Sequence, residues 1–193
     1  MKKKKIIKVT ILGILLIFIV GIAYFNVLFP MKIEPVKIEC INWDATYPYV
    51  EAFEESYKTG EYDKDTTIIH NFDGTLPSHN PDDYATVYID IKATNRCFFD
   101  HFSVDGYISK IEKNSDMALW SATLSSVIST TVFRTSSSGA TINMDLYVKD
   151  RSDEEIKEML RSITIDVVYK GDILGKRTAT VQLADVEDIT IER

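Results

Sequence analysis

The amino-terminal segment constrains this chain more than any other part of the sequence. Five lysines, the last of them Lys8, precede an apolar run from Val9 to Phe29 that only Thr10 and Asn26 interrupt. At about 1.5 Å of rise per residue this run makes a helix of roughly 31 Å, enough to cross a hydrocarbon core of about 30 Å. The run therefore predicts a transmembrane helix.

The charges on either side of the run predict its orientation. Because lysines are concentrated before the span, we expect residues 1–8 to be a cytoplasmic tail, 9–29 a signal-anchor, and 30–193 an extracytoplasmic domain. The alternative is a signal peptide cleaved near the small residues 21–23, which would release a secreted domain. Bulky residues follow that site and the apolar run continues, which favours a single-pass anchor in the cell membrane.

The part of the chain after Pro30 is acidic. It carries all 29 acidic residues but only 17 of the 22 basic ones, for a formal charge of −12. Such a charge repels nucleic acid and other polyanions, so no nucleic-acid partner is expected. Its length suits one domain with its own core. The oligolysine start suggests a low-GC Gram-positive bacterium, and we expect a protein of its cell envelope.

Alternation of apolar and polar residues dominates the chain from Ala85 onward and predicts antiparallel strands. A long strand is expected at Ala118–Arg134, in which Trp120 and Ala122 face inward and Thr123 outward. The other expected features are strands at 85–93, 140–148, 163–169 and 179–183, one or two strands in 98–111 with a turn at 105–106, a turn at 135–139, and an edge strand in 184–193.

The segment 33–84 breaks this pattern and is expected to be irregular. It begins with a strand at 33–41 and holds a short helix at 47–59 that Gly60 ends. Ser152 and Glu155 form a capping box for a second short helix. The order strand, helix, strand, hairpin resembles the last strands of an immunoglobulin-like sandwich. We therefore expect a mainly β fold with such an antiparallel sandwich core at 85–193, although the antibody-type Cys…Trp…Cys spacing is absent.

Two cysteines lie in the exported part. Cys40 falls on the inward face of its predicted strand, and Cys97 follows the strand at 85–93. An oxidising compartment permits a disulfide between them, and two buried thiols are the alternative.

One loop carries the residue types that bind calcium. Asp73, Asp82 and Asp83 share the segment with His79, and oxygen-rich loops can ligate a cation, although the EF-hand pattern is missing. The alternative is a solvated loop. Near the strand at 98–111, Asp100 and His101 predict a histidine at the margin of a sheet.

No catalytic residue and no cofactor are predicted. The histidines form no HExxH motif, and the serines at 136–138 lack a nucleophile elbow. Tyr49, Phe53 and Tyr57 line one side of the predicted helix, as a packed face or as a surface for a partner. We therefore expect a non-catalytic module that binds another envelope protein; the alternatives are a ligand or calcium sensor and, last, a hydrolase whose site is not visible.

Overall fold

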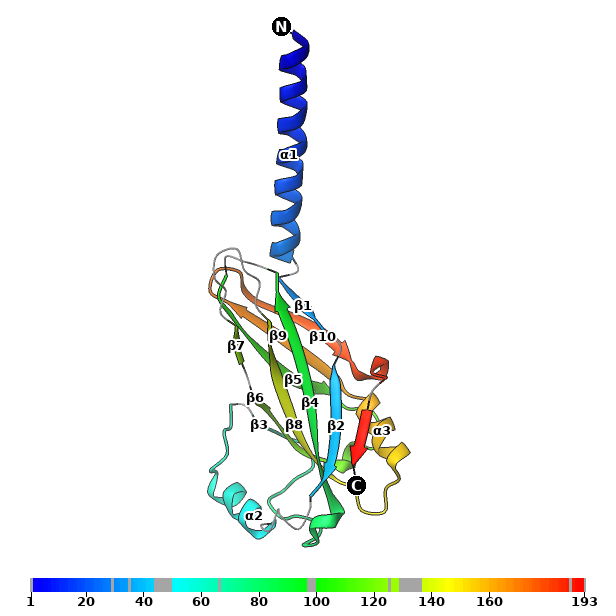
Figure 1. Ribbon diagram of the computed structural model, residues 1–193. Coiled ribbons are helices and arrows are strands. Elements are labelled where there is room, and N and C mark those ends of the chain that lie inside the picture. The colour runs from blue at the N-terminus through cyan, green and yellow to red at the C-terminus, as the bar shows by residue number, and fades with distance from the viewer. Residues whose placement is uncertain are drawn as a thin grey trace.

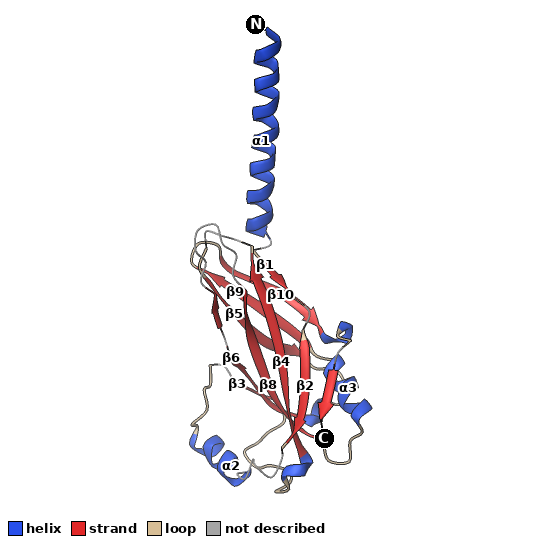
Figure 2. Cartoon of the chain, viewed as in Figure 1, coloured by secondary structure: helices blue, strands red, loops and turns tan. Residues whose placement is uncertain are grey.

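Two β-sheets face each other below one long helix in the computed structural model of the chain (Figure 1, Figure 2). The arrangement is mainly β and sandwich-like, as the alternation predicted. The structure describes the following residues: 2–28, 30–34, 36–43, 50–65, 67–96, 100–124, 126–128, 137–187 and 189–192.

The long helix, α1, runs from Lys2 to Leu28 and stands clear of the sheets (Figure 1). Its stretch Ile6–Tyr24 has a mean hydropathy of 2.8, and none of it is buried against the rest of the chain. This helix is long and apolar enough to span a membrane or to serve as a signal sequence. Val9 lies within α1, whereas Phe29, the predicted end of the span, lies outside the described residues.

The first sheet holds seven of the described strands in the order β11-β2-β4-β8-β6-β3, with β1 paired to the end of β4 nearest α1. β11 runs parallel to β2 at the edge, so the predicted edge strand of the tail is confirmed. The bounds are β1 Met31–Ile33, β2 Lys37–Asn42, β3 Thr67–Ile69, β4 Tyr84–Asn95, β6 Ala118–Leu124, β8 Ser137–Tyr147 and β11 Ile189–Glu192.

The second sheet holds four of the described strands in the order β10-β9-β5-β7. Helix α3 connects β8 of the first sheet to β9 of the second, and its predicted Ser152–Glu155 capping box is present. The bounds are β5 Phe102–Lys110, β7 Ser126–Ile128, β9 Thr164–Gly171, β10 Gly175–Gln182, α2 Val50–Thr59, α3 Asp153–Arg161, and the 3-10 turns η1 Pro81–Asp83, η2 Ser115–Met117 and η3 Leu183–Asp185.

The core lies between the two sheets and follows the predicted inward rows. Ile89 and Ile142 of the first sheet and Val104 and Ile165 of the second are at most 1% exposed. Helix α3 adds its apolar stripe to the same cluster. Alternate burial along the strands therefore accounts for the sandwich arrangement.

The predicted turn at Asp105-Gly106 is wrong, because β5 passes straight through both residues. Gly106 faces the other sheet, where a Cβ atom would lie 2.8 Å from Cδ1 of Ile91 and 3.3 Å from Cδ1 of Ile142. Glycine at this position allows the two sheets to approach each other. A pattern that often marks a turn is here a requirement of packing.

The predicted faces of β6 are also wrong. A register shift between Ala118 and Trp120 reverses the alternation, so Trp120 lies on the outer face of the sheet opposite Asp145. Thr123 points inward, is 6% exposed, and donates a hydrogen bond to the carbonyl oxygen of Gly106 in the opposite sheet. Of the predicted turn at 135–139, residues 137–139 belong to β8 instead, and 135–136 lie outside the described residues.

The sandwich has two distinct ends. At the α1 end, the N–H of Arg96 donates to the carbonyl oxygen of Pro30 at 2.7 Å, so the first residues after α1 are fixed against the end of β4. The far end carries α2, α3 and the loop before η1 (Figure 1). We use the names α1 end and far end below.

Candidate functional site

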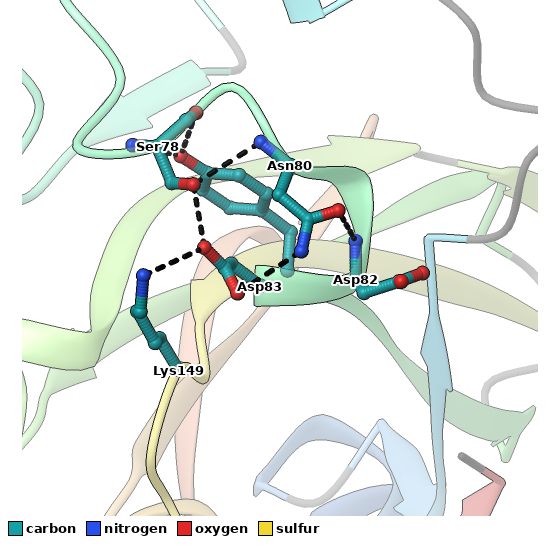
Figure 3. Close-up of polar contacts among 6 residues, drawn as sticks. Ser78, Asn80, Asp82, Asp83 and Lys149 are labelled. Atoms are coloured by element: carbon teal, nitrogen blue, oxygen red, sulfur yellow. Dashed lines mark hydrogen bonds and ion pairs between the residues drawn. The ribbon is translucent and has the colours of Figure 1, made fainter.

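The predicted metal loop at the far end is closed by its own hydrogen bonds (Figure 3). The carboxylate of Asp83 accepts hydrogen bonds from the Ser78 hydroxyl and, at 3.4 Å, from Nδ2 of Asn80, and Nζ of Lys149 lies 3.4 Å from it. The Ser78 bond and the Lys149 charge lower the pKa of Asp83 despite its burial. The Asp82 N–H donates to Oδ1 of Asn80, which caps η1.

Tyr84 fastens this loop to the sheet. Its hydroxyl accepts the Ser78 N–H at 2.8 Å and donates to the Ser78 carbonyl oxygen at 2.5 Å. Burial raises the pKa of Tyr84 to about 12. Both backbone groups of Ser78 are therefore satisfied by a single phenol, which gives the loop a fixed shape.

The structure does not bring the three predicted metal ligands together. Asp73 accepts the N–H of Thr75 at 3.1 Å, whereas the Asp83 carboxylate is taken up by Ser78, Asn80 and Lys149. In the described part of the chain, no group of three or more His, Cys, Asp or Glu side chains is placed to hold a metal ion. We attribute this to the ammonium and amide donors that already surround Asp83.

The predicted aromatic face of α2 is only partly described. Tyr49 lies outside the described residues, as does the side chain of Phe53. Tyr57 is half-buried, with its ring 5.1 Å from that of Tyr62 and 4.5 Å from that of Phe72. Its pKa is raised, first by burial. Tyr57 thus packs α2 against the far end, which leaves less of its ring for a partner.

An aromatic cluster covers the outer face of the first sheet at this end. The Trp43 ring stacks on Tyr84 with centroids 4.7 Å apart and lies 6.3 Å from the ring of Trp120. Buried members of the cluster are Trp43, Phe72, Leu76, Tyr84, Leu119 and Trp120.

Asp145 lies beneath this cluster. Its Oδ1 accepts hydrogen bonds from the Thr86 hydroxyl at 2.5 Å and from Nε1 of Trp43 at 3.2 Å. Burial raises the pKa of Asp145 to about 6, and the hydrogen bonds offset only part of this effect. No sequence pattern points to this group, because Asp145 occupies an ordinary outward position in the alternation of its strand.

A second buried polar pair involves His70, which follows β3. Nε2 of His70 lies 3.1 Å from Oγ of Ser121, and burial lowers the pKa of the imidazole. The pocket beside it measures about 340 Å³. Ser121 is only 2% exposed, so its hydroxyl is out of reach of a substrate and the pair fits a structural role.

Cys40 is buried in β2, on the inward face as predicted. Cys97 lies outside the described residues, so the disulfide stays a prediction.

Asp100, next to His101, is a buried carboxylate at the α1 end. The Asp100 side chain is buried, and it accepts hydrogen bonds from the Tyr169 hydroxyl and from the N–H groups of Ile173 and Leu174. Burial alone would raise the pKa of Asp100, but these bonds outweigh it and the pKa is lowered. His101 is exposed.

The edge strand β10 is the feature best suited to bind another chain. It pairs over eight residues with β9, and no described strand pairs with its other side. Its side chains are exposed or half-buried along its whole length. Alternate backbone N–H and C=O groups of such a strand point away from the sheet and can pair with an added strand.

A groove lies beside the far half of β10, between the edges of the two sheets. It measures about 430 Å³ and is lined by Thr180, Val181 and Gln182 together with Ile33, Glu34, Val36, Asp185 and Val186. Apolar side chains from both sheets thus meet next to unpaired backbone. This arrangement can take an extended segment whose alternate side chains enter the groove.

Comparison of the chain with models of protein families, with curated proteins and with solved structures found no match.

Proposed function

We propose that this protein is a non-catalytic, membrane-anchored interaction module of a bacterial cell envelope. In this proposal α1 is an uncleaved anchor with its amino terminus in the cytoplasm, and the sandwich lies outside the cell membrane. The lysines in the first part of α1 and the length of its apolar stretch support this topology.

The observation that carries the proposal is the free edge of β10 beside an apolar groove. We infer that a partner protein adds an extended segment along this strand. Main-chain hydrogen bonds to β10 would supply affinity, and alternate apolar side chains in the groove near Val181 and Val36 would supply specificity.

The geometry favours a different protein over a second copy of this chain. Strands of the sandwich run between the α1 end and the far end, so copies anchored in one membrane have β10 pointing the same way. A symmetric two-fold contact between the same strand edges requires antiparallel strands.

The proposed fold type is immunoglobulin-like. Its support is the strand order: β2-β4-β8-β6 opposite β10-β9-β5-β7 corresponds to the A-B-E-D sheet opposite a G-F-C sheet with one extra strand. The sheet switch between β6 and β7 and the parallel β11 depart from the common pattern. In such a fold β10 takes the place of the last strand, G.

Two proline variants of the full-length chain test the proposal. Adjacent residues in a strand direct their backbone N–H groups to opposite sides of the strand. Proline has no N–H, so one of the variants T178P and A179P removes a donor on the free edge of β10, and the other removes a donor to β9. We expect the variant that lacks the outward donor to keep the melting temperature of wild type and to lose the partner protein that wild type captures by cross-linking in native membranes. Retention of the captured protein by both variants would contradict the proposal.

The variant that loses the donor to β9 serves as the matched control. Because it breaks a bond within the sandwich, we expect it to lower the melting temperature. Comparing the two variants separates loss of the edge from loss of the fold.

A further inference from the structure

The tip of the β9–β10 hairpin exposes an apolar side chain at the α1 end. Ile173 is 66% exposed, whereas the other exposed large apolar residues described outside α1 are between 37% and 38% exposed. A single exposed isoleucine is ordinary on a protein surface. Ile173 differs because it lies at the α1 end and because the turn that carries it is held by hydrogen bonds.

The turn that carries Ile173 is held in a fixed shape. The Ile173 N–H donates to Oδ1 of Asp100 at 2.8 Å, and the Leu174 N–H donates to Oδ2 at 3.1 Å. A Cβ atom on Gly171 would lie 2.1 Å from the same carboxylate, so glycine is required there. A buried charge thus fixes a turn whose outermost side chain is apolar.

A chain of contacts ties this turn to the residues that leave α1. The Asp172 N–H donates to the His101 carbonyl oxygen at 3.0 Å, and Nδ2 of Asn95 contacts the Asp100 carbonyl oxygen at 3.4 Å. Asn95 in turn pairs with Met31, three residues after the end of α1. The hairpin tip therefore lies next to the exit of the helix.

The length of α1 sets the depth of this exit. Its 27 residues span about 40 Å, which matches a bilayer of about 40–45 Å including both headgroup layers. Met31 would then emerge at the outer headgroups, at the level of the tip.

Basic side chains follow the tip although the exported domain is acidic. Lys176 and Arg177 begin β10 and are exposed, whereas Lys170 on the other arm is paired with Asp105. Cationic side chains beside an apolar one suit an anionic lipid surface.

We propose that the β9–β10 tip inserts Ile173 into the headgroup region of the membrane that holds α1, with Lys176 and Arg177 on anionic headgroups. This contact fixes the sandwich upright and turns the far half of β10 away from the lipid. It rests on the anchor part of the proposed function and not on the partner.

Brominated-lipid quenching of I173W tests this contact. The native tryptophans, Trp43 and Trp120, are buried at the far end, so they supply a constant background. The full-length variant is placed in phosphatidylcholine–phosphatidylglycerol vesicles with bromine near the headgroup end of the acyl chains. We expect bromine to remove the emission that I173W adds to wild type, and K176E/R177E in the same background to recover part of it.

E154W, at an exposed position of α3 near the far end, is the matched control and is expected to lose no emission. Equal emission of I173W in brominated and plain vesicles would overturn the proposal. Flotation of the same samples separates this failure from failure of the anchor, because a chain without an anchor leaves the vesicle fraction altogether.

Discussion

The two ends of the sandwich each hold a largely enclosed aspartate, and the two carboxylates are treated in opposite ways. At the α1 end Asp100 receives a phenol and two backbone N–H groups, which lower its pKa. At the far end Asp145 lies under tryptophans, and burial raises its pKa to about 6. Both carboxylates are removed from water and accept hydrogen bonds; at Asp100 the donors outweigh burial, whereas at Asp145 burial outweighs the donors.

The two ends are therefore stabilised by different interactions. The α1 end is fixed by hydrogen bonds to an ion, which set the direction of a turn and of its exposed tip. At the far end aromatic packing covers the sheet face around Asp145 and tolerates an ion at an energetic cost, whereas the loop before η1 is held by donors to the Asp83 carboxylate.

The largest expected effect is at the far end. We expect W120A to lower the free energy of unfolding by about 4 kcal/mol, because a buried aromatic side chain leaves a cavity in the cluster. Chemical denaturation of the full-length chain in detergent measures this change. Y88A, on the exposed part of the same sheet face, is the control and should cost less than about 1 kcal/mol. Equal losses in both variants would mean that the aromatic cluster adds no more stability than an exposed aromatic side chain on the same face.

At the α1 end the matching variant is D100A. It leaves the N–H groups of Ile173 and Leu174 without their acceptor, so we expect a loss of about 3 kcal/mol in the same assay. D172A removes an exposed carboxylate from the same turn and is expected to stay within about 0.5 kcal/mol of wild type. A D100A loss no greater than that of D172A would remove the distinction between the two ends.

The raised pKa of Asp145 predicts that the free energy of unfolding falls as the pH rises from about 4 to 6. Its folded pKa of about 6 exceeds the ordinary value of 3.8, so the native state binds the proton more tightly in this window. A rise of the pKa from 3.8 to about 6 corresponds to at most about 3 kcal/mol. We expect D145N to remove this dependence in unfolding measurements at pH 4 and 7. Parallel pH curves for variant and wild type would show that Asp145 is not destabilised by burial.

The smallest expected effect is the acid dependence of Asp100, which has the opposite sign. Because its folded pKa is lowered, its contribution is present above the ordinary value of 3.8 and is lost as the pH falls below that value. Below pH 4, D100A should therefore lose less stability than wild type does. Equal acid sensitivity in melting experiments would place the responsible carboxylates elsewhere.

Local patterns predicted the elements whose signals are local. The apolar run gave α1, the alternation gave the inward rows of β4 and β8, and Ser152 with Glu155 gave the start of α3. Contacts between distant segments were not accessible in this way. Gly106 looked like a turn residue because its neighbours in the other sheet, Ile91 and Ile142, are not visible in the sequence.

The candidate site shows the same limit. No local pattern identifies the free edge strand, because which strand lies at the edge depends on how all the strands are ordered. The alternation of its strand places Asp145 on the solvent side, but Trp43, from the segment before β4, covers it. Asp82 and Asp83 were predicted as cation ligands from their place in one loop. The ammonium group that pairs with Asp83 belongs to Lys149, which lies far along the chain, so the sequence alone does not reveal this pairing.

Photocross-linking from β10 in native cells tests the central proposal most directly. A photoreactive residue is placed at Thr178, on the free edge, and in a second strain at Tyr88, an exposed residue on a strand paired on both sides. We predict one dominant protein adduct from position 178 and none from position 88. No adduct from 178, or the same adducts from both positions, would contradict an interaction module that binds through this edge.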